Sequence, residues 1–236
     1  MTAQDLLLKF DPESPGAVYL FCPGKGARAK MPTFEPMLAE RCADRIIGGT
    51  VDPTMKDFAF AAFYADETAA GQIVMDAQTL PFLAARRVIL VRHAEKYLTD
   101  SAAGAMLEYL AAPNESTVLI FIAHKMDKRT KFYKACDKLG AVVECPALTA
   151  AEIDMWILAE TKTRGRTIDR EAIRALVDRA GTHLSDVDNA LTNIINFVGD
   201  ARTALTADDV NTACADVAEE EIWALTDAVA ASEPGQ

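Results

Sequence analysis

The sequence has 236 residues, of which 50% are hydrophobic, 25% are charged and 7% are aromatic. Its 24 lysines and arginines against 35 aspartates and glutamates give a formal net charge of −11 at pH 7. This composition excludes disordered, collagen-like and disulfide-framework proteins. The acidic charge argues against autonomous DNA binding, which usually needs clustered basic side chains. At about 150 residues per domain, the length permits one large domain or one domain with a smaller second one.

In the first part of the chain, apolar runs alternate with segments of helical periodicity. We expect strands at residues 17–21, 57–64, 88–91, 117–123 and 141–145, and helices at 33–47, 69–77, 101–112 and 127–139. The pair Gly48-Gly49 is predicted to end the first of these helices. Strands that are apolar on both faces and alternate with helices indicate a parallel sheet covered on both sides. Residues 1–147 are therefore predicted to form one α/β domain.

After Pro146 the pattern changes to helix alone. The expected caps and ends of these helices are Thr149 with Glu152, Asp169, Gly181, Gly199, and Thr206 with Asp209, and a last helix is expected around Ile222, Leu225 and Val229. Residues 148–215 are predicted to form a small helical domain. The polar end, Ser232 to Gln236, suggests that residues 216–236 begin a connection to a further domain.

The five cysteines do not have the spacing of a metal site or of a disulfide framework. We expect Cys22, Cys42, Cys136, Cys145 and Cys214 to be buried and reduced. The N-terminus lacks a basic region followed by a long apolar segment. The longest apolar run, residues 118–123, is much shorter than the roughly 20 residues that cross a bilayer. We therefore expect a cytoplasmic protein with no signal peptide or membrane span.

The loop after the first strand is where a nucleotide-binding α/β domain would hold phosphates. A phosphate loop needs the order G-x-x-x-x-G-K-[ST], so that backbone N–H groups, a lysine and a hydroxyl surround the phosphates and magnesium. Here Gly24, Lys25 and Gly26 follow Pro23 in the wrong order, and no Ser or Thr follows a Gly-Lys pair. The sequence predicts a degenerate loop that binds no ATP.

Catalytic residues are not evident elsewhere. The strand at 88–91 continues as Arg92-His93-Ala94-Glu95, where an ATPase would offer a pair of acidic residues to magnesium. His93, His124 and His183 stand in unrelated contexts, and no G-x-S-x-G motif occurs. We predict no catalytic residues, no metal site and no cofactor.

Large apolar residues crowd the connection that precedes the strand at 88–91. Leu80, Phe82 and Leu83 lie around Pro81, where polar residues are expected. They could tuck under the sheet as loop anchors, which is the common fate of large apolar residues, or enter an apolar pocket on a partner. Arg86 and Arg87 follow, and pairing with local carboxylates is preferred over support of these apolar residues.

At this point the chain resembles the delta subunit of the bacterial DNA polymerase III clamp loader. The resemblance lies in residues 79–88 (TLPFLAARRV), 58–67, 18–21, 107–121, 125–129, 165–168, 181–184 and 205–210, and it covers nearly the whole chain. No single motif is diagnostic, but their order and spacing are specific together. The resemblance implies an AAA+-like parallel-sheet domain followed by a small helical lid domain. The family continues into a C-terminal collar domain, which would follow residues 216–236.

The resemblance also implies a function without catalysis by this subunit, as a component of the DNA-directed DNA polymerase holoenzyme. In this family the residues at Leu80, Phe82 and Leu83 dock into an apolar pocket of the ring-shaped sliding clamp, beta, and favour its opening for loading onto primed DNA. Implied partners are the clamp, the gamma/tau and delta prime subunits, and primed DNA within the complex. No membrane is involved.

Two other hypotheses remain open on the residues alone. One is an active ATP-binding enzyme of the phosphate-loop type with an atypical loop around Lys25. The other is a stand-alone nucleic-acid adaptor that uses a basic set, namely Lys125, Lys128, Arg129, Lys131 and Lys134. A solvated helix face explains that basic set better, because the total charge is acidic.

Overall fold

The computed structural model describes residues 1–26, 30–81 and 84–213. The chain divides into two units, Met1–Ala147 and Leu148–Gln236. Each unit encloses a hydrophobic core of its own. No helix among the described residues is long and apolar enough to cross a membrane.

The first unit is built on a five-stranded sheet with the order β2-β3-β4-β1-β5. Its strands are β1 (Val18–Cys22), β2 (Phe60–Tyr64), β3 (Arg87–Arg92), β4 (Thr117–Ile122) and β5 (Val142–Glu144). Its helices are α1 (Ala3–Lys9), α2 (Pro36–Thr50), α3 (Lys56–Ala59), α4 (Ala70–Gln78), α5 (Asp100–Ala111) and α6 (Lys131–Lys138), with short 3-10 turns at Pro53–Met55 and Ala94–Leu98. All strand pairs are parallel, which confirms the predicted fold class.

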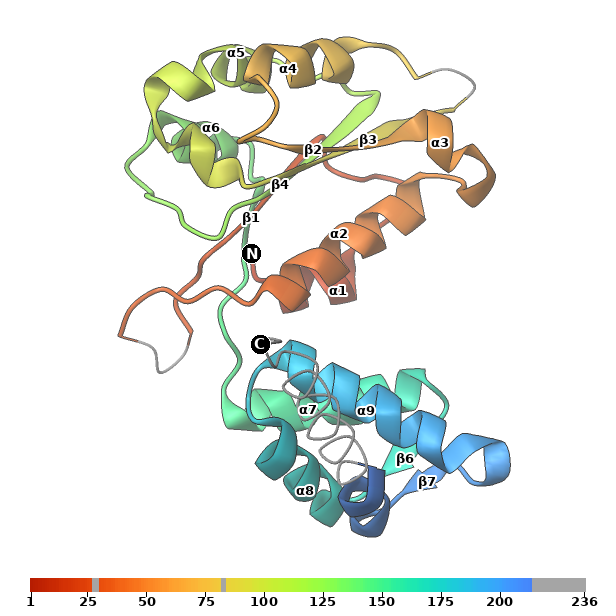
Figure 1. The fold of residues 1–236 in the computed structure, drawn as a ribbon. Coiled ribbons are helices and arrows are strands. Elements are labelled where there is room, and N and C mark those ends of the chain that lie inside the picture. Colours follow the sequence, from red (N-terminus) through yellow and green to blue (C-terminus); the bar gives the residue numbers. More distant parts are fainter. Residues whose placement is uncertain (27–29, 82–83, 214–236) are drawn as a thin grey trace, which may run out of the picture. The chain divides into compact units, whose positions relative to one another are not determined.

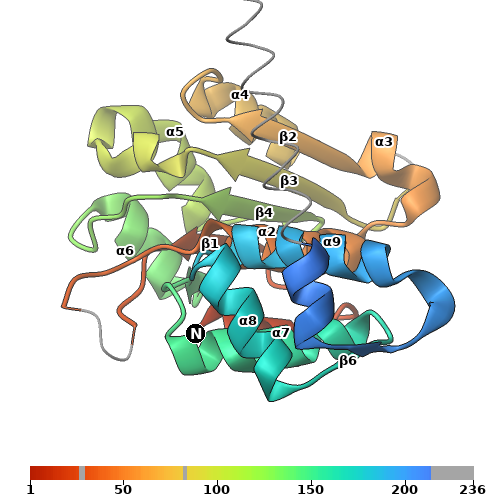
Figure 2. The same ribbon diagram turned by 60° about the horizontal axis from the view of Figure 1, so that its bottom comes forward.

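Helices cover both faces of this sheet. Helices α4, α5 and α6 lie on one face, and α1 and α2 lie on the other (Figure 1). Figure 2 shows β2, β3, β4 and β1 side by side in that order. Every residue of β1 and β4 is buried, as expected of strands that pack on both faces. The apolar runs of the sequence thus become the centre of the core.

The structure corrects several predicted boundaries in this unit. Gly48 and Gly49 do not end α2, which continues to Thr50 with Val51 as its C-cap. Neither glycine has the positive φ that a glycine stop requires. A Cβ on Gly49 would lie 2.8 Å from Cε1 of Phe10, so this glycine permits close packing of two chain segments. Gly49 thus lies inside the helix at a point where the contact with Phe10 leaves no room for a side chain.

Three other elements differ from the sequence predictions. The strand expected at 57–64 begins only at Phe60, because residues 56–59 form α3. Helix α6 begins at Lys131 instead of residue 127, since the hydroxyl of Thr130 caps it by accepting the N–H of Tyr133. Helix α1 was not predicted; Thr2 and Asp5 form a capping box at its start.

The second unit is mainly helical, with helices α7 (Ala150–Thr163), α8 (Arg170–Ala180) and α9 (Leu184–Val198). The predicted caps are confirmed: Thr149 and Glu152 form a capping box, Asp169 accepts from the N–H of Ala172, and Gly181 ends α8 with a φ of 77°. Residues 207–213 are also helical. The last helix expected, around Ile222, lies outside the described residues.

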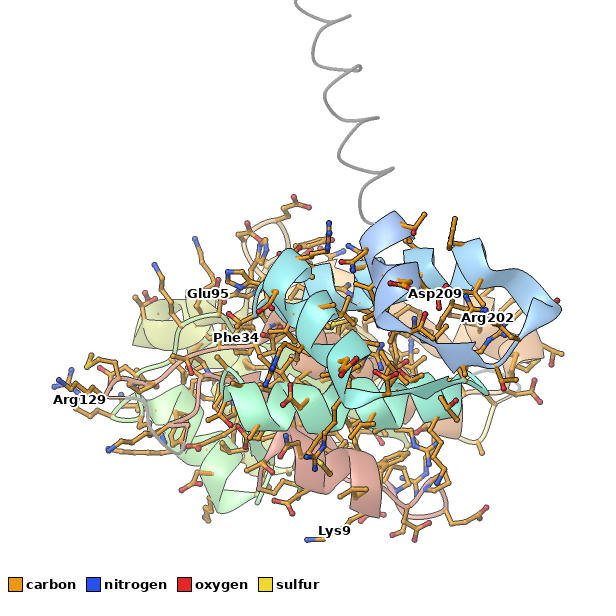
Figure 3. All side chains as sticks on the ribbon, turned by 90° about the horizontal axis from the view of Figure 1, so that it is seen from below. Lys9, Phe34, Glu95, Arg129, Arg202 and Asp209 are labelled. Atoms are coloured by element: carbon orange, nitrogen blue, oxygen red, sulfur yellow. The ribbon has the colours of Figure 1, made fainter. Side chains whose placement is uncertain are left out.

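The prediction of helix alone in the second unit was wrong. Strands β6 (Thr167–Ile168) and β7 (Ala204–Leu205) pair in parallel, with Thr167 opposite Ala204 and Ile168 opposite Leu205. Ion pairs support this region: Arg202 bonds the carboxylate of Asp209 (Figure 3), and Arg166 reaches Asp200 at 3.2 Å. A two-residue strand is too short to produce a period that the sequence would display.

The four described cysteines are free and buried, as predicted. Burial raises the pKa of Cys22, Cys42 and Cys136 to about 12, which keeps these thiols protonated and unreactive at neutral pH. Cys214 lies outside the described residues. The described thiols therefore act as small core residues.

Candidate functional site

The loop between α4 and β3 carries the predicted apolar wedge, by which we mean Leu80, Phe82 and Leu83. Thr79 is the C-cap of α4: its N–H and its hydroxyl both donate to the carbonyl of Met75, at 3.2 and 2.8 Å. Leu80 follows with 74% of its surface exposed. Phe82 and Leu83 lie outside the described residues. The position of Leu80 does not support the interpretation that it tucks under the sheet.

Arg87, which follows the wedge, pairs with a local carboxylate, as predicted. Its Nη1 lies 3.0 Å from Oδ1 of Asp76 in α4. Arg86 donates from Nη1 to the carbonyl of Pro15 at 3.5 Å. Both arginine side chains therefore bond to other residues of the first unit near the N-terminal end of β3.

The loop after β1 is closed by its own backbone. Gly24 and Thr33 exchange two hydrogen bonds, N to O at 3.0 Å and 2.9 Å, so these N–H groups are already used. Lys25 is exposed and Gly26 is partly buried, and residues 27–29 lie outside the described residues. A loop that pairs with itself offers fewer backbone donors to a phosphate.

The N-terminus of α2 holds a protein carboxylate. Glu35 is its N-cap, 8% exposed, and Oε1 accepts the N–H of Met37 at 3.2 Å; Pro36 removes another N–H from the first turn. In a phosphate loop this helix end would face the phosphates. Here the side chain of Glu35 occupies that point and already accepts one of its N–H groups, which leaves fewer donors for an anion.

Gly24 has no room for a side chain. A Cβ there would lie 2.6 Å from Cβ of Glu144 and 3.2 Å from Cδ of Pro146. We expect Gly24→Ala to lower the free energy of unfolding by about 1–3 kcal/mol, since an overpacked site must shift backbone atoms. Urea denaturation measures this change.

Gly104→Ala is the matched control for that variant. Gly104 lies inside α5, and a Cβ there would meet nothing within 4 Å. It should stabilise the protein by about 0.5–1 kcal/mol, because alanine favours a helix interior over glycine. Equal stability losses in both variants would contradict the close approach at Gly24.

The carboxyl end of β3 carries an ion pair that the sequence did not reveal. Arg92 stands where an ATPase would place acidic residues, and it bonds Glu40 of α2 in two places, Nε to Oε1 at 2.9 Å and Nη2 to Oε2 at 2.7 Å. The partners are 52 positions apart, so only the fold brings them together. Both carboxylate oxygens of Glu40 are thus bonded to Arg92.

Two histidines lie beside this ion pair. His93 has a φ of 57°, and among the described residues it is the only non-glycine residue with positive φ. Its Nδ1 is 2.9 Å from Oδ1 of Asp66, and this hydrogen bond lowers the pKa of Asp66. Glu95 accepts the backbone N–H of His124, whose ring centroid lies 4.9 Å from that of Phe34. The ring centroids of His93 and His124 are 6.3 Å apart, so the structure brings together two of the three histidines.

These histidines do not form a metal site with acidic or thiol neighbours. Within the described part of the chain, no three His, Cys, Asp or Glu residues stand close enough together to hold a metal ion. The basic set is partly neutralised: Lys128 bonds Glu144 at 2.5 Å and Arg129 bonds Asp127 at 2.7 Å. Arg129 points outward from the first unit (Figure 3).

Comparisons with known proteins point to one family. Residues 34–146 match the model of the family described as DNA polymerase III, delta subunit. The DNA polymerase III subunit delta of Bacillus subtilis (strain 168) is 30% identical over 200 residues, which cover 81% of this chain and 57% of that protein. The chain thus spans a little over half the length of this relative.

Solved structures agree with that match. The Bacillus subtilis DNA clamp loader delta protein superposes with a TM-score of 0.67 and 28% identity, over 89% of this chain and 62% of that chain. The RuvB Holliday junction branch migration motor of Thermotoga maritima superposes with a TM-score of 0.51 and 10% identity, over 89% of this chain and 66% of the RuvB chain. At this identity the match shows a similar fold and nothing more. The fold is AAA+-like, and the chain belongs to the family of the DNA polymerase III delta subunit.

Proposed function

We propose that this chain is a non-catalytic subunit of the replicative clamp loader that binds the sliding clamp through the apolar wedge and favours opening of the ring. The observation that carries this proposal is Leu80, 74% exposed directly after the C-cap of α4, in a member of the delta-subunit family. An exposed leucine held at the end of a helix is suited to enter an apolar pocket on a partner.

Burial of the wedge can supply enough free energy to shift the ring between its closed and open forms. Burying the three side chains of the wedge contributes roughly 5–8 kcal/mol before the costs of association. Only the part of this energy that differs between the closed and open ring can shift the equilibrium between them. A pocket that accepts the wedge fully only in the open form would use most of it for opening.

The remnant of the nucleotide site supports a role without ATP on this subunit. The N–H groups of Gly24 and Thr33 each donate to the carbonyl oxygen of the other residue, Glu35 caps α2, and Arg92 stands at the end of β3 paired with Glu40. In the proposed assembly, this chain has the gamma/tau and delta prime subunits as partners. Primed DNA is then contacted mainly by those neighbours, in keeping with the charge of −11.

Complex formation with the sliding clamp of the same organism tests the proposal. The chain and the clamp are mixed and run on a sizing column with light scattering, and a complex is expected to elute before either protein. The triple variant Leu80→Ala/Phe82→Ala/Leu83→Ala should lose it. Absence of the complex with the unaltered chain, or an unchanged complex with the triple variant, would reject the proposal.

A further inference from the structure

The two ends of the wedge loop are fixed by bonds among α4, β3, β4 and the connection between α5 and β4. The loop leaves α4 at Gln78 and enters β3 at Arg87. We call the residues that fix its ends the loop base. The loop base consists of Asp76, Ala77, Thr79, Arg87, Asn114 and Thr117.

An ion pair joins the two ends directly. Nη1 of Arg87 lies 3.0 Å from Oδ1 of Asp76 and 3.4 Å from its carbonyl oxygen. The side chains are 17% and 27% exposed, respectively, so water screens this pair less than a surface pair. Nε of Arg87 is buried and has no hydrogen-bond partner among the described residues. Burying a hydrogen-bond donor without a partner is unfavourable. The ion pair with Asp76 therefore holds the Arg87 side chain in a position that carries this free-energy cost.

A second set of bonds holds the helix end of the loop. The carbonyl of Ala77 accepts from Oγ1 of Thr117 at 2.8 Å and from Nδ2 of Asn114 at 3.2 Å. Thr117 is fully buried at the start of β4, next to β3. The C-cap Thr79 follows two residues later. The last turn of α4 is thus fixed to the sheet immediately before Leu80.

We propose that Asp76 and Arg87 are positioning residues for clamp binding, which fix the two ends of the loop that carries Leu80 without touching the clamp themselves. The inference rests on the proposed function. Its physical basis is preorganisation: a loop whose ends are fixed loses less conformational freedom when its apolar side chains enter a pocket. It also explains why Arg87 follows an apolar segment, since its carboxylate partner, Asp76, is at the other end of the same loop.

The same strand offers a matched control. Arg92 ends β3 and bonds Glu40 of α2, with side chains 29% and 40% exposed. Asp76→Asn and Glu40→Gln each remove one carboxylate charge from an arginine of β3, but only Asp76 belongs to the loop base. We expect Asp76→Asn to weaken clamp binding about tenfold, on the scale of ordering a few side chains, and Glu40→Gln to leave it within about twofold. Calorimetric titration with the clamp measures both.

A double-mutant cycle separates positioning from general destabilisation. In the background of Leu80→Ala, Asp76→Asn should weaken binding by much less than in the unaltered chain, because its effect acts through Leu80. Asp76→Glu, which keeps the carboxylate, should recover most of the lost affinity. Equal losses from Asp76→Asn and Glu40→Gln, or an undiminished effect of Asp76→Asn in the Leu80→Ala background, would overturn the inference.

Trypsin distinguishes failure of the inference from failure of the proposed function. Arg86 and Arg87 are both retained in Asp76→Asn, so cleavage after them reports opening of the loop in the free chain. Asp76→Asn should be cut there severalfold faster, and Glu40→Gln should not. If the unaltered chain does not bind the clamp, the function fails whatever trypsin shows. Unchanged cleavage in Asp76→Asn would overturn the loop base itself.

Discussion

Replacing Leu80 with alanine is expected to weaken the complex with the sliding clamp about 30-fold or more. The estimate takes Leu80 as a central anchor worth at least about 2 kcal/mol when truncated. Because 74% of Leu80 is exposed in the free chain, the variant should keep its free energy of unfolding within about 0.5 kcal/mol. Surface plasmon resonance with immobilised clamp measures the affinity, and chemical denaturation measures the stability.

Leu8→Ala is the control for that loss. Leu8 lies on α1 and is 85% exposed, so the same methyl groups are removed from another leucine that is exposed at least as much as Leu80. Clamp affinity should not change in this variant. If both alanine variants weakened the complex alike, or if Leu80→Ala bound as tightly as the unaltered chain, Leu80 would have no special part in binding.

Much of the fold could be predicted because its signals are local or strongly apolar. Central strands that are buried on both faces appear as continuous apolar runs, as in residues 118–122. Helix caps depend on side chains within three residues of the cap, which is why Thr149 with Glu152 and Asp169 were recognisable. These features need no knowledge of distant contacts.

The errors arise where a distant contact decides the local structure. The pair Gly48-Gly49 resembles a helix stop, yet α2 continues because packing against Phe10 requires a glycine at position 49. Strands β6 and β7 are two residues each and pair across 37 positions, from Thr167 to Ala204. Neither feature leaves a periodic signal in its own segment.

The same division applies to the candidate site. The wedge was recognisable because apolar residues in a connection break the usual pattern. The ion pairs that frame β3 were not, because the partners of Arg87 and Arg92 lie 11 and 52 positions away. Arginines at both ends of a buried strand were the available signal that carboxylates must approach from neighbouring helices.

Phe121→Ala should cause the largest loss of stability in the first unit, about 3–5 kcal/mol. Phe121 lies in β4, the middle strand of the sheet, and is fully buried. Its ring meets those of Phe132 and Tyr97 edge to face, with centroids 5.1 and 6.2 Å apart. Truncation would leave a cavity between β4, the 3-10 turn Ala94–Leu98 and α6. Thermal and urea unfolding measure the loss.

Tyr97→Phe tests the same cluster of rings with a change that should keep the ring contacts and not destabilise the protein. Tyr97 is 2% exposed, burial raises its pKa to about 12, and its hydroxyl has no hydrogen-bond partner among the described residues. Removing an unpaired buried hydroxyl keeps the ring contacts and should be neutral or stabilising. If Tyr97→Phe cost as much as Phe121→Ala, the hydroxyl would have a bonding partner. If both cost under about 1 kcal/mol, the three rings would not form a packed core.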